Sequence, residues 1–120
     1  MLKPGEAKAY YWKGFTYGEQ GKLEDAENAY TKALYYDPYY VEAFFARGNI
    51  RYSLGKLDES IEDFNKVISL QNNFADAVYN RGLSYLANKN YTSALQDFSK
   101  VVELDQEDAD AWYYIGFIYN

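Results

Sequence analysis

The sequence predicts an all-α protein built from repeated helical hairpins, and two observations lead to this fold class. Glycine recurs every 34 residues along the 120-residue chain, at Gly14, Gly48, Gly82 and Gly116. Around these glycines, apolar residues recur three and four positions apart, which is the spacing of one face of an α-helix. A fixed period of about 20–50 residues is typical of proteins in which similar units stack on one another. The chain is therefore expected to fold as an array of helical units.

The 34-residue period divides the chain into three full units and one half unit. The full units are residues 7–40, 41–74 and 75–108, and residues 109–120 are the first helix of a fourth unit. Residues 1–6 align with the tail of a preceding unit, or form a leader. Because both ends match parts of units, we expect this chain to be a slice of a longer protein.

Each unit is expected to contain two helices separated by turn-forming residues. In chain order, the expected helices are 7–20, 23–36, 41–54, 57–70, 75–88, 91–104 and 109–120. The first helix of each full unit ends at a turn that contains Gly21, Gly55 or Asn88. The second helix ends at Asp37-Pro38 in the first unit, and at asparagine-rich or acidic segments in the next two.

Each glycine of the repeat lies inside an expected helix, where it costs about 0.5–1 kcal/mol relative to alanine. Close approach of two helices would compensate for this cost. We expect the glycines to lie opposite small residues of the paired helix, namely Ala26, Ser60 and Ala94. The large residues of the same helices are expected to fill the angle between one hairpin and the next; they are Tyr30, Phe64 and Phe98.

These columns resemble the tetratricopeptide repeat family, whose pattern is W-x2-L-G-x2-Y, then A-x3-F, then P. Residues 109–120 match its first half at Trp112, Ile115, Gly116 and Tyr119. The first unit matches at Tyr10, Gly14, Tyr17, Ala26, Tyr30 and Pro38, and the third at Val78, Gly82, Tyr85, Ala94 and Phe98. The resemblance implies a helical-hairpin solenoid, coiled as a right-handed superhelix, whose first helices line a concave groove that binds ligands.

Basic residues stand at the leucine position of this pattern in all three full units, at Lys13, Arg47 and Arg81. Asp63 and Asp97 also recur 34 residues apart. We therefore expect Arg47 and Arg81 to pair with these aspartates, within a repeat or across neighbouring repeats. Solvated charges on the surface are the alternative, and they would contribute little to stability.

The first helices carry a second stripe of side chains, roughly 130° around the helix from the stripe that packs on the partner helix. The stripe is our predicted peptide-binding site and comprises Tyr11, Phe15, Phe45, Asn49, Tyr52, Tyr79, Asn80, Leu83, Tyr113 and Phe117. In the concave groove, its aromatic rings would bury apolar groups of a peptide, and its asparagines would hold the peptide backbone. Alternatively, these aromatic residues pack between adjacent first helices as part of the structure.

The composition argues against several classes of function. The chain has no Cys and no His, which removes zinc–thiolate sites, thiol nucleophiles and the commonest general base. Its net charge of -6 argues against binding of nucleic acid. No apolar run approaches the roughly 20 residues of a membrane span, and no signal-peptide profile is present. We predict a non-catalytic protein-interaction scaffold without metal or cofactor, and the sequence favours an intracellular location without indicating a compartment.

The resemblance also allows one known ligand class to be considered residue by residue. The family's clamp for acidic chaperone tails needs Lys and Asn in one first helix, Asn in the next, and Lys and Arg in the third. The corresponding residues are Tyr11, Phe15, Ala46, Asp76 and Asn80, or, one unit later, Phe45, Asn49, Asn80, Asp110 and Tyr114. We therefore expect that this chain does not bind a carboxylate-terminated chaperone tail.

The last twenty residues carry most of the negative charge and an apolar helix. They contain Glu103, Asp105, Glu107, Asp108 and Asp110 but no Lys or Arg. These acids either contact a basic segment of an apolar or aromatic peptide partner, or lie in a solvated turn before a helix N-terminus. The final helix presents Trp112, Ile115, Ile118 and Tyr119, so self-assembly into a homo-oligomer through the repeat ends is the alternative function.

Overall fold

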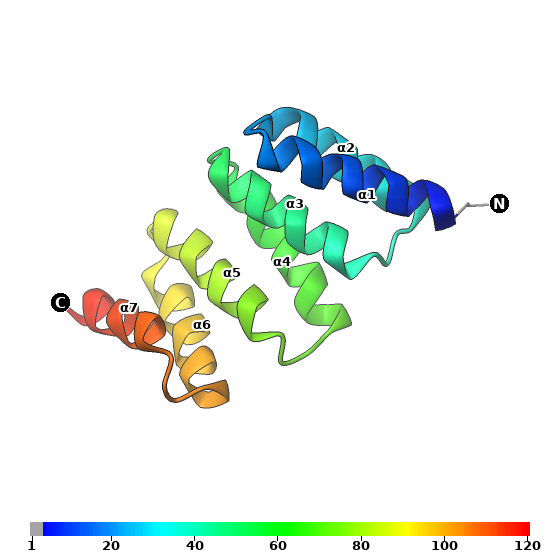
Figure 1. Cartoon of the computed structure of the whole chain (residues 1–120). Helices are drawn as coiled ribbons and strands as arrows, with labels where there is room; N and C mark the ends of the chain where they lie inside the picture. Colours follow the sequence, from blue (N-terminus) through cyan, green and yellow to red (C-terminus); the bar gives the residue numbers. More distant parts are fainter. Residues whose placement is uncertain (1–3) are drawn as a thin grey trace.

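The structure, a computed structural model, describes residues 4–120 and places seven α-helices in that range (Figure 1). They are α1 (Pro4–Glu19), α2 (Leu23–Tyr36), α3 (Val41–Ser53), α4 (Leu57–Leu70), α5 (Ala75–Ala87), α6 (Tyr91–Leu104) and α7 (Ala109–Tyr119). No strand occurs in this part of the chain, so the predicted all-α class is confirmed. The observed helix ends lie within about three residues of the expected ones.

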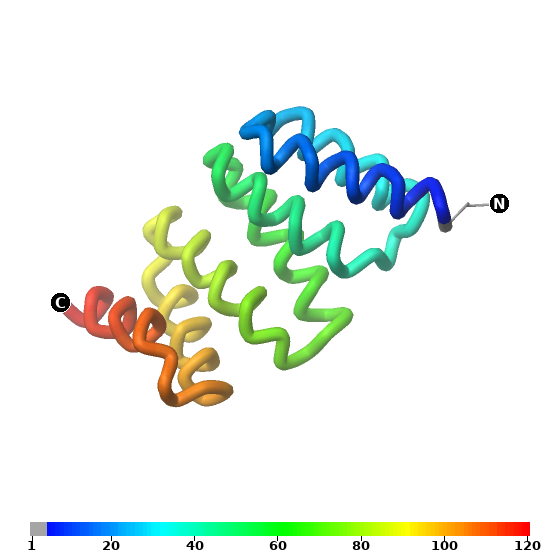
Figure 2. Tube along the Cα trace, viewed as in Figure 1, coloured from blue at the N-terminus to red at the C-terminus, as the bar shows by residue number. Residues whose placement is uncertain are grey.

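The helices form three antiparallel pairs followed by α7. We call α1–α2 hairpin 1, α3–α4 hairpin 2 and α5–α6 hairpin 3. Figures 1 and 2 show the hairpins stacked in chain order, with α1, α3, α5 and α7 side by side in one layer and α2, α4 and α6 in a second layer. The resulting solenoid measures 49 × 26 × 22 Å. None of the helices in residues 4–120 is both long enough and apolar enough to cross a bilayer.

The N-terminal segment differs from the expectation. Helix α1 begins at Pro4, three residues before the helix start expected from the sequence, and the tail or leader expected over residues 1–6 stays a prediction. Residues 1–3 lie outside the described residues. Pro4 suits this position because a proline in the first turn of a helix removes an N–H that has no partner there.

Left-handed backbone allows the tight turn inside each hairpin. Gly21 and Gly55 adopt φ angles of 76° and 78°, which glycine accepts without a steric cost. The third hairpin has Lys89 at the equivalent place, with φ 61°. Asn90 then caps α6, because its side chain accepts a hydrogen bond from the backbone N–H of Ser93. The turn of hairpin 3 therefore keeps the same shape without glycine.

The recurring glycines of the three full units pack against the aromatic residues of the paired helices. A Cβ atom added at Gly14 or Gly48 would lie 2.8 Å from ring atoms of Tyr30 or Phe64. The rings were expected to fill the angle between hairpins, and they also cover the glycine of the helix with which they are paired. The missing side chain makes room for the aromatic ring of the paired helix, and real Cβ atoms do not tolerate so short a contact.

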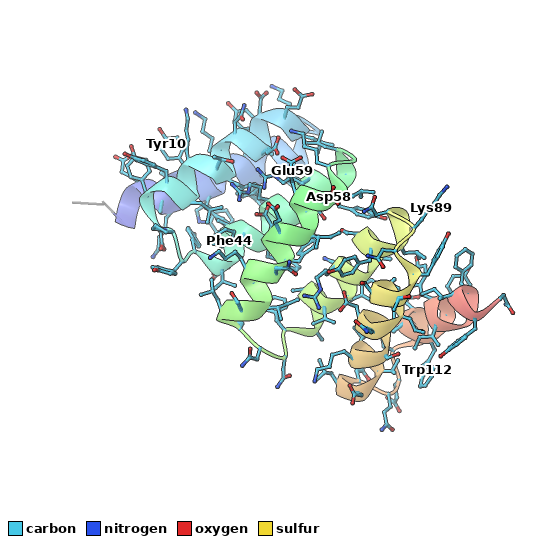
Figure 3. The ribbon with its side chains drawn as sticks, turned by 180° about the vertical axis from the view of Figure 1, so that it is seen from behind. Tyr10, Phe44, Asp58, Glu59, Lys89 and Trp112 are labelled. Atoms are coloured by element: carbon cyan, nitrogen blue, oxygen red, sulfur yellow. The ribbon has the colours of Figure 1, made fainter. Side chains whose placement is uncertain are left out.

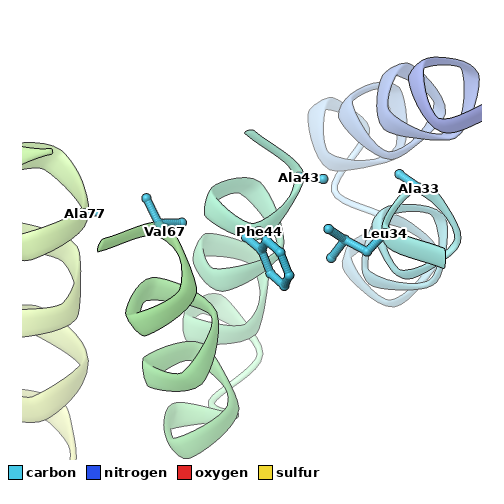
Figure 4. Packing of buried hydrophobic residues seen from close by; sticks show 6 residues of the cluster. All are labelled: Ala33, Leu34, Ala43, Phe44, Val67 and Ala77. Atoms are coloured by element: carbon cyan, nitrogen blue, oxygen red, sulfur yellow. The ribbon is translucent and has the colours of Figure 1, made fainter. Parts of the chain in front are cut away.

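Apolar contacts also join the hairpins to one another. Figure 4 shows Leu34 on α2 facing Phe44 on α3, and Val67 near Ala77 on α5. These side chains are buried, and each hairpin thus packs its second helix against the first helix of the next hairpin. Such nearest-neighbour packing is how a solenoid builds a continuous core.

Two of the three basic residues in the leucine column, Arg47 and Arg81, form largely buried ion pairs. Arg47 donates to both carboxylate oxygens of Asp63, and Arg81 does the same with Asp97. The pairing predicted from the sequence is confirmed, and each pair lies within one hairpin. Each arginine also donates from Nη1 to the preceding hairpin, to Thr31 or Asn65.

Candidate functional site

The predicted stripe lies on the layer formed by α1, α3, α5 and α7. Four of its members are exposed, and the other six are half-buried; the exposed ones are Phe15, Tyr52, Tyr113 and Phe117. Exposure reaches 65% at Tyr113. The ten side chains of the stripe therefore lie at the surface, and most of them also pack partly against the rest of the protein.

The three half-buried aromatic residues of the stripe each contact the buried aromatic ring of the paired helix in their own hairpin. Ring centroids are 5.6 Å apart for Tyr11 and Tyr30, 6.0 Å for Phe45 and Phe64, and 5.7 Å for Tyr79 and Phe98. Tilted and edge-on aromatic pairs at such distances are favourable. The same rings also contact Tyr40, Phe74 and Tyr114, which lie at the start of or in the next first helix along the array. They thus have a structural role, as the alternative interpretation holds, and they remain partly exposed.

A hollow of about 350 Å³ lies between α1 and α3, and we call it the α1–α3 hollow. Four predicted residues line it: Tyr11, Phe15, Phe45 and Asn49. The rest of its lining is Tyr30, Val41, Glu42, Ala46, Gln71 and Phe74, which the sequence prediction missed. Phe74 lies 34 residues after Tyr40, so the repeat period could have identified it.

Two more of the predicted residues line a second hollow, of about 330 Å³. It lies where α5, α6 and α7 meet, and Tyr113 and Phe117 line it together with Leu86, Ala87, Lys89, Tyr91 and Tyr114. The other four predicted residues line neither hollow; they are Tyr52, Tyr79, Asn80 and Leu83. The structure thus divides the predicted stripe into two apolar concavities, with an amide pair between them.

The amide pair links α3 to α5. Asn80 Nδ2 donates to Asn49 Oδ1 over 2.8 Å. This bond uses one donor of Asn80 and the acceptor of Asn49, which leaves a carbonyl oxygen and an amide group with capacity for further hydrogen bonds. The two asparagines therefore hold each other in place and still offer one acceptor and donors to a peptide backbone.

Three partly buried tyrosines of the α1, α3 and α5 layer remain protonated at neutral pH: Tyr11, Tyr40 and Tyr79. Burial, followed by the nearby Glu42 carboxylate, raises the pKa of both Tyr11 and Tyr40. Burial also raises the pKa of Tyr79 to about 12, with further contributions from Tyr114 and Asp110. Each phenol can thus donate a hydrogen bond to a ligand. Among the described residues, no group of three or more acidic side chains is arranged to hold a metal ion.

Family models match most of the chain. A model described as tetratricopeptide repeat matches residues 7–40 and 75–108, and one described as TPR repeat matches residues 48–89. No curated protein matches this chain significantly.

Solved structures with this architecture cover nearly the whole chain. The first TPR domain of Spaghetti (RPAP3), bound to the HSP90 peptide SRMEEVD, is 26% identical, with a TM-score of 0.91 over 98% of this chain and 94% of that one. The second TPR domain of human RPAP3, in complex with the HSP70 peptide SGPTIEEVD, is 23% identical, with a TM-score of 0.90 over 98% and 99%. A crystal structure of MamA is 24% identical, with a TM-score of 0.92 over 98% and 68%.

These complexes overturn one prediction. The expectation that excluded a carboxylate-terminated chaperone tail is wrong, because similar domains are solved with peptides that end in EEVD. The prediction compared residue types at five positions, whereas a peptide is held by the shape and polar groups of a whole surface. Two of those positions, Asn49 and Asn80, do form a paired polar group beside the α1–α3 hollow.

Proposed function

This chain belongs to the tetratricopeptide repeat family, and from that premise we propose that it is a non-catalytic scaffold that binds a peptide segment of a partner protein. The peptide would lie along the layer of α1, α3, α5 and α7. This extends to the present chain what the similar Spaghetti domain does with its HSP90 peptide.

The α1–α3 hollow is the observation that carries the proposal. Its volume of about 350 Å³ exceeds the roughly 150 Å³ of a cavity that accepts benzene. Phe15 and Phe45 supply apolar walls from two different helices. A concave apolar site with a few polar groups at its edge is the usual form of a ligand site. We infer that it takes one large apolar side chain of the peptide.

The amide pair would fix the peptide beside this anchor. The free atoms of Asn49 and Asn80 can bond one carbonyl and one N–H of an extended backbone. Burial of an anchor side chain contributes roughly 1.5–3 kcal/mol, and the backbone contacts add specificity. Together with the cost of ordering a short peptide, this predicts an affinity in the micromolar range, about -8 kcal/mol.

Binding of selected peptides would test the proposal. Twelve-residue peptides would be selected from a displayed random library on the intact protein, and then titrated together with SRMEEVD and SGPTIEEVD by fluorescence anisotropy. Phe15→Ala and Phe45→Ala should weaken binding by about tenfold or more. Tyr35→Ala is the matched control, because Tyr35 is 71% exposed on α2 and lines neither hollow. Equal affinity in all four proteins would refute binding at the hollow.

Self-assembly is the second candidate function, and the surface of α7 favours it. Trp112, Tyr113, Phe117 and Tyr119 on this short helix are all more than half exposed. Nothing lies within 4 Å of a Cβ added at Gly116, whereas the equivalent glycines are covered by rings. Exposed apolar surface of this kind promotes association. Light scattering over a dilution series would detect it, and a monomer at the highest concentration would exclude it.

A further inference from the structure

The interface between hairpins 1 and 2 has two chemically different ends. At one end the chain connection, residues 37–40, lies beside the apolar contact of Leu34 with Phe44 (Figure 4). Seven residues away from this contact along both helices, or roughly 10 Å, the two hairpins are joined by ion pairs. There Glu27 of α2 meets Arg51 of α3 and Lys56 of the turn that follows.

Glu27 is the carboxylate that hairpin 1 contributes to this cluster. Its Oε2 accepts from Arg51 Nε and its Oε1 from Lys56 Nζ, both over 2.8 Å. The residue is only 7% exposed. Arg51 also donates to Asp63 over 3.1 Å, so Glu27 joins an ion network that otherwise belongs to hairpin 2. Glu59, at the start of α4 in Figure 3, lies near enough to act on Arg51 and Lys56.

The interface one repeat later shows what the cluster replaces. The positions of Glu27, Arg51 and Lys56 are taken there by Ile61, Tyr85 and Asn90. Its buried polar contact is a neutral one, between the hydroxyls of Ser60 and Ser84 over 2.6 Å. Within residues 4–120, no ion pair joins hairpin 2 to hairpin 3. The first interface therefore contains ion pairs at positions where the second contains a neutral hydrogen bond.

We propose that Glu27 is a positioning residue for the α1–α3 hollow. The hollow has walls on both hairpins, because Phe15 belongs to α1 and Phe45 to α3. Hairpin 1 moves as one body, since Gly14 of α1 is packed against the ring of Tyr30 on α2. When Glu27 loses its charge, Arg51 and Lys56 keep theirs without this partner, and hairpin 1 pivots about the Leu34–Phe44 end. The spacing of the two walls then changes.

Amide hydrogen exchange of the intact protein, without any peptide, tests directly whether Glu27 holds hairpin 1 against hairpin 2. Glu27→Gln should accelerate exchange of the protected amides of α1 and α2 by about tenfold or more relative to α6. Glu24→Gln, at an exposed position of the same helix, is the control and should leave exchange unchanged. Lys56→Gln removes one of the two cations that bind Glu27, and it should also accelerate amide exchange in α1 and α2, by about threefold. Wild-type rates in Glu27→Gln, or equal acceleration in all helices, would overturn the proposal.

A rescue variant separates positioning from general damage. The triple change Glu27→Ile, Arg51→Tyr and Lys56→Asn copies the second interface and should restore slow exchange in α1 and α2. Ion pairs replaced by packed apolar groups are often neutral or stabilising. If the triple variant exchanges as fast as Glu27→Gln, the ionic cluster is not what holds the joint.

The link to the hollow rests on the proposed function and has its own readout. Affinity for a selected peptide should fall about tenfold in Glu27→Gln and recover in the triple variant. Fast exchange with unchanged affinity would overturn the positioning role. If wild-type protein binds no peptide at all, the proposed function fails, while the exchange experiment still decides whether Glu27 holds the joint.

Discussion

Arg81 donates two parallel hydrogen bonds to the Asp97 carboxylate, 2.9 Å from Nε and 2.7 Å from Nη2, and these bonds join the two helices of hairpin 3. The carboxylate is nearly fully buried, at 4% exposure of the residue. Arg47 and Asp63 repeat this geometry one hairpin earlier. In both hairpins an arginine paired with an aspartate thus stands where the family pattern has leucine. The arginine is compatible with the folded state because of this pairing, since an unpaired buried charge is costly.

Removal of one partner should therefore cost much more than removal of both. We predict that Arg81→Ala destabilises the protein by about 3–5 kcal/mol, since it leaves the Asp97 carboxylate buried without its partner. The double change Arg81→Leu and Asp97→Ala should recover most of that loss. Urea unfolding at pH 7 would measure both. Glu62→Ala, at an exposed position of α4, should change stability by no more than about 0.5 kcal/mol.

The glycine column gives a prediction with an internal control. Gly48→Ala places a methyl group 2.8 Å from the Phe64 ring and should cost about 1–3 kcal/mol. Gly116→Ala has nothing within 4 Å and should instead stabilise α7 by up to about 1 kcal/mol through helix propensity. Thermal unfolding monitored by circular dichroism would show opposite shifts of Tm. A loss of the same size at both positions would mean that the ring contact is not the cause.

The Glu27 carboxyl predicts a dependence of stability on pH. Burial alone would raise its pKa, but hydrogen bonds from Lys56 and Arg51 outweigh burial and lower the pKa below its ordinary value. A lowered pKa means that the folded state favours the ionised form, so this stabilisation is present above about pH 4.5 and is lost as the pH falls through the folded-state pKa. The difference in unfolding free energy between wild type and Glu27→Gln should therefore be largest at pH 6–7 and shrink below pH 4. A difference independent of pH would contradict this assignment.

Because of Tyr79, we expect a second dependence of stability on pH, of the opposite sign and at high pH. Its pKa is raised to about 12, chiefly by burial, so the folded state favours the neutral phenol. This contribution is complete below pH 10 and is lost as the pH rises toward about 12. Wild-type protein should lose stability over that interval, and Tyr79→Phe should lose less. Urea unfolding at pH 9, 10 and 11 would compare them, and parallel losses in both proteins would count against the assignment.

Local patterns in the sequence were sufficient for the helices and for the ion pairs inside hairpins 2 and 3. The three- and four-residue spacing and the turn residues placed all seven helices within about three residues. The 34-residue recurrence of Asp63 and Asp97 also identified their arginine partners. Both the helices and the ion pairs are features that repeat along the chain. When the same residues recur every 34 positions, a contact expected in one hairpin is also expected in the next.

Features that occur once in the array were missed. Glu27 has no counterpart in the later units, where Ile61 stands, so the period gave no reason to single it out. The lining of the α1–α3 hollow includes Gln71 and Phe74 from the α4–α5 connection, which no helical stripe contains. The contact of Tyr30 and Phe64 with the glycines was also missed, because spacing alone does not say which residues of the paired helix lie over a crossing point.

The sequence by itself determined that this chain is a stack of helical hairpins, because helix formation and hairpin register depend on residues close together in the chain. Only the tertiary structure decided that Tyr30 and Phe64 fill the space left by Gly14 and Gly48. It alone brought Glu27 between Arg51 and Lys56, and opened the hollow between α1 and α3. Those contacts depend on how far and at what angle helices approach, which the packing of all side chains sets together.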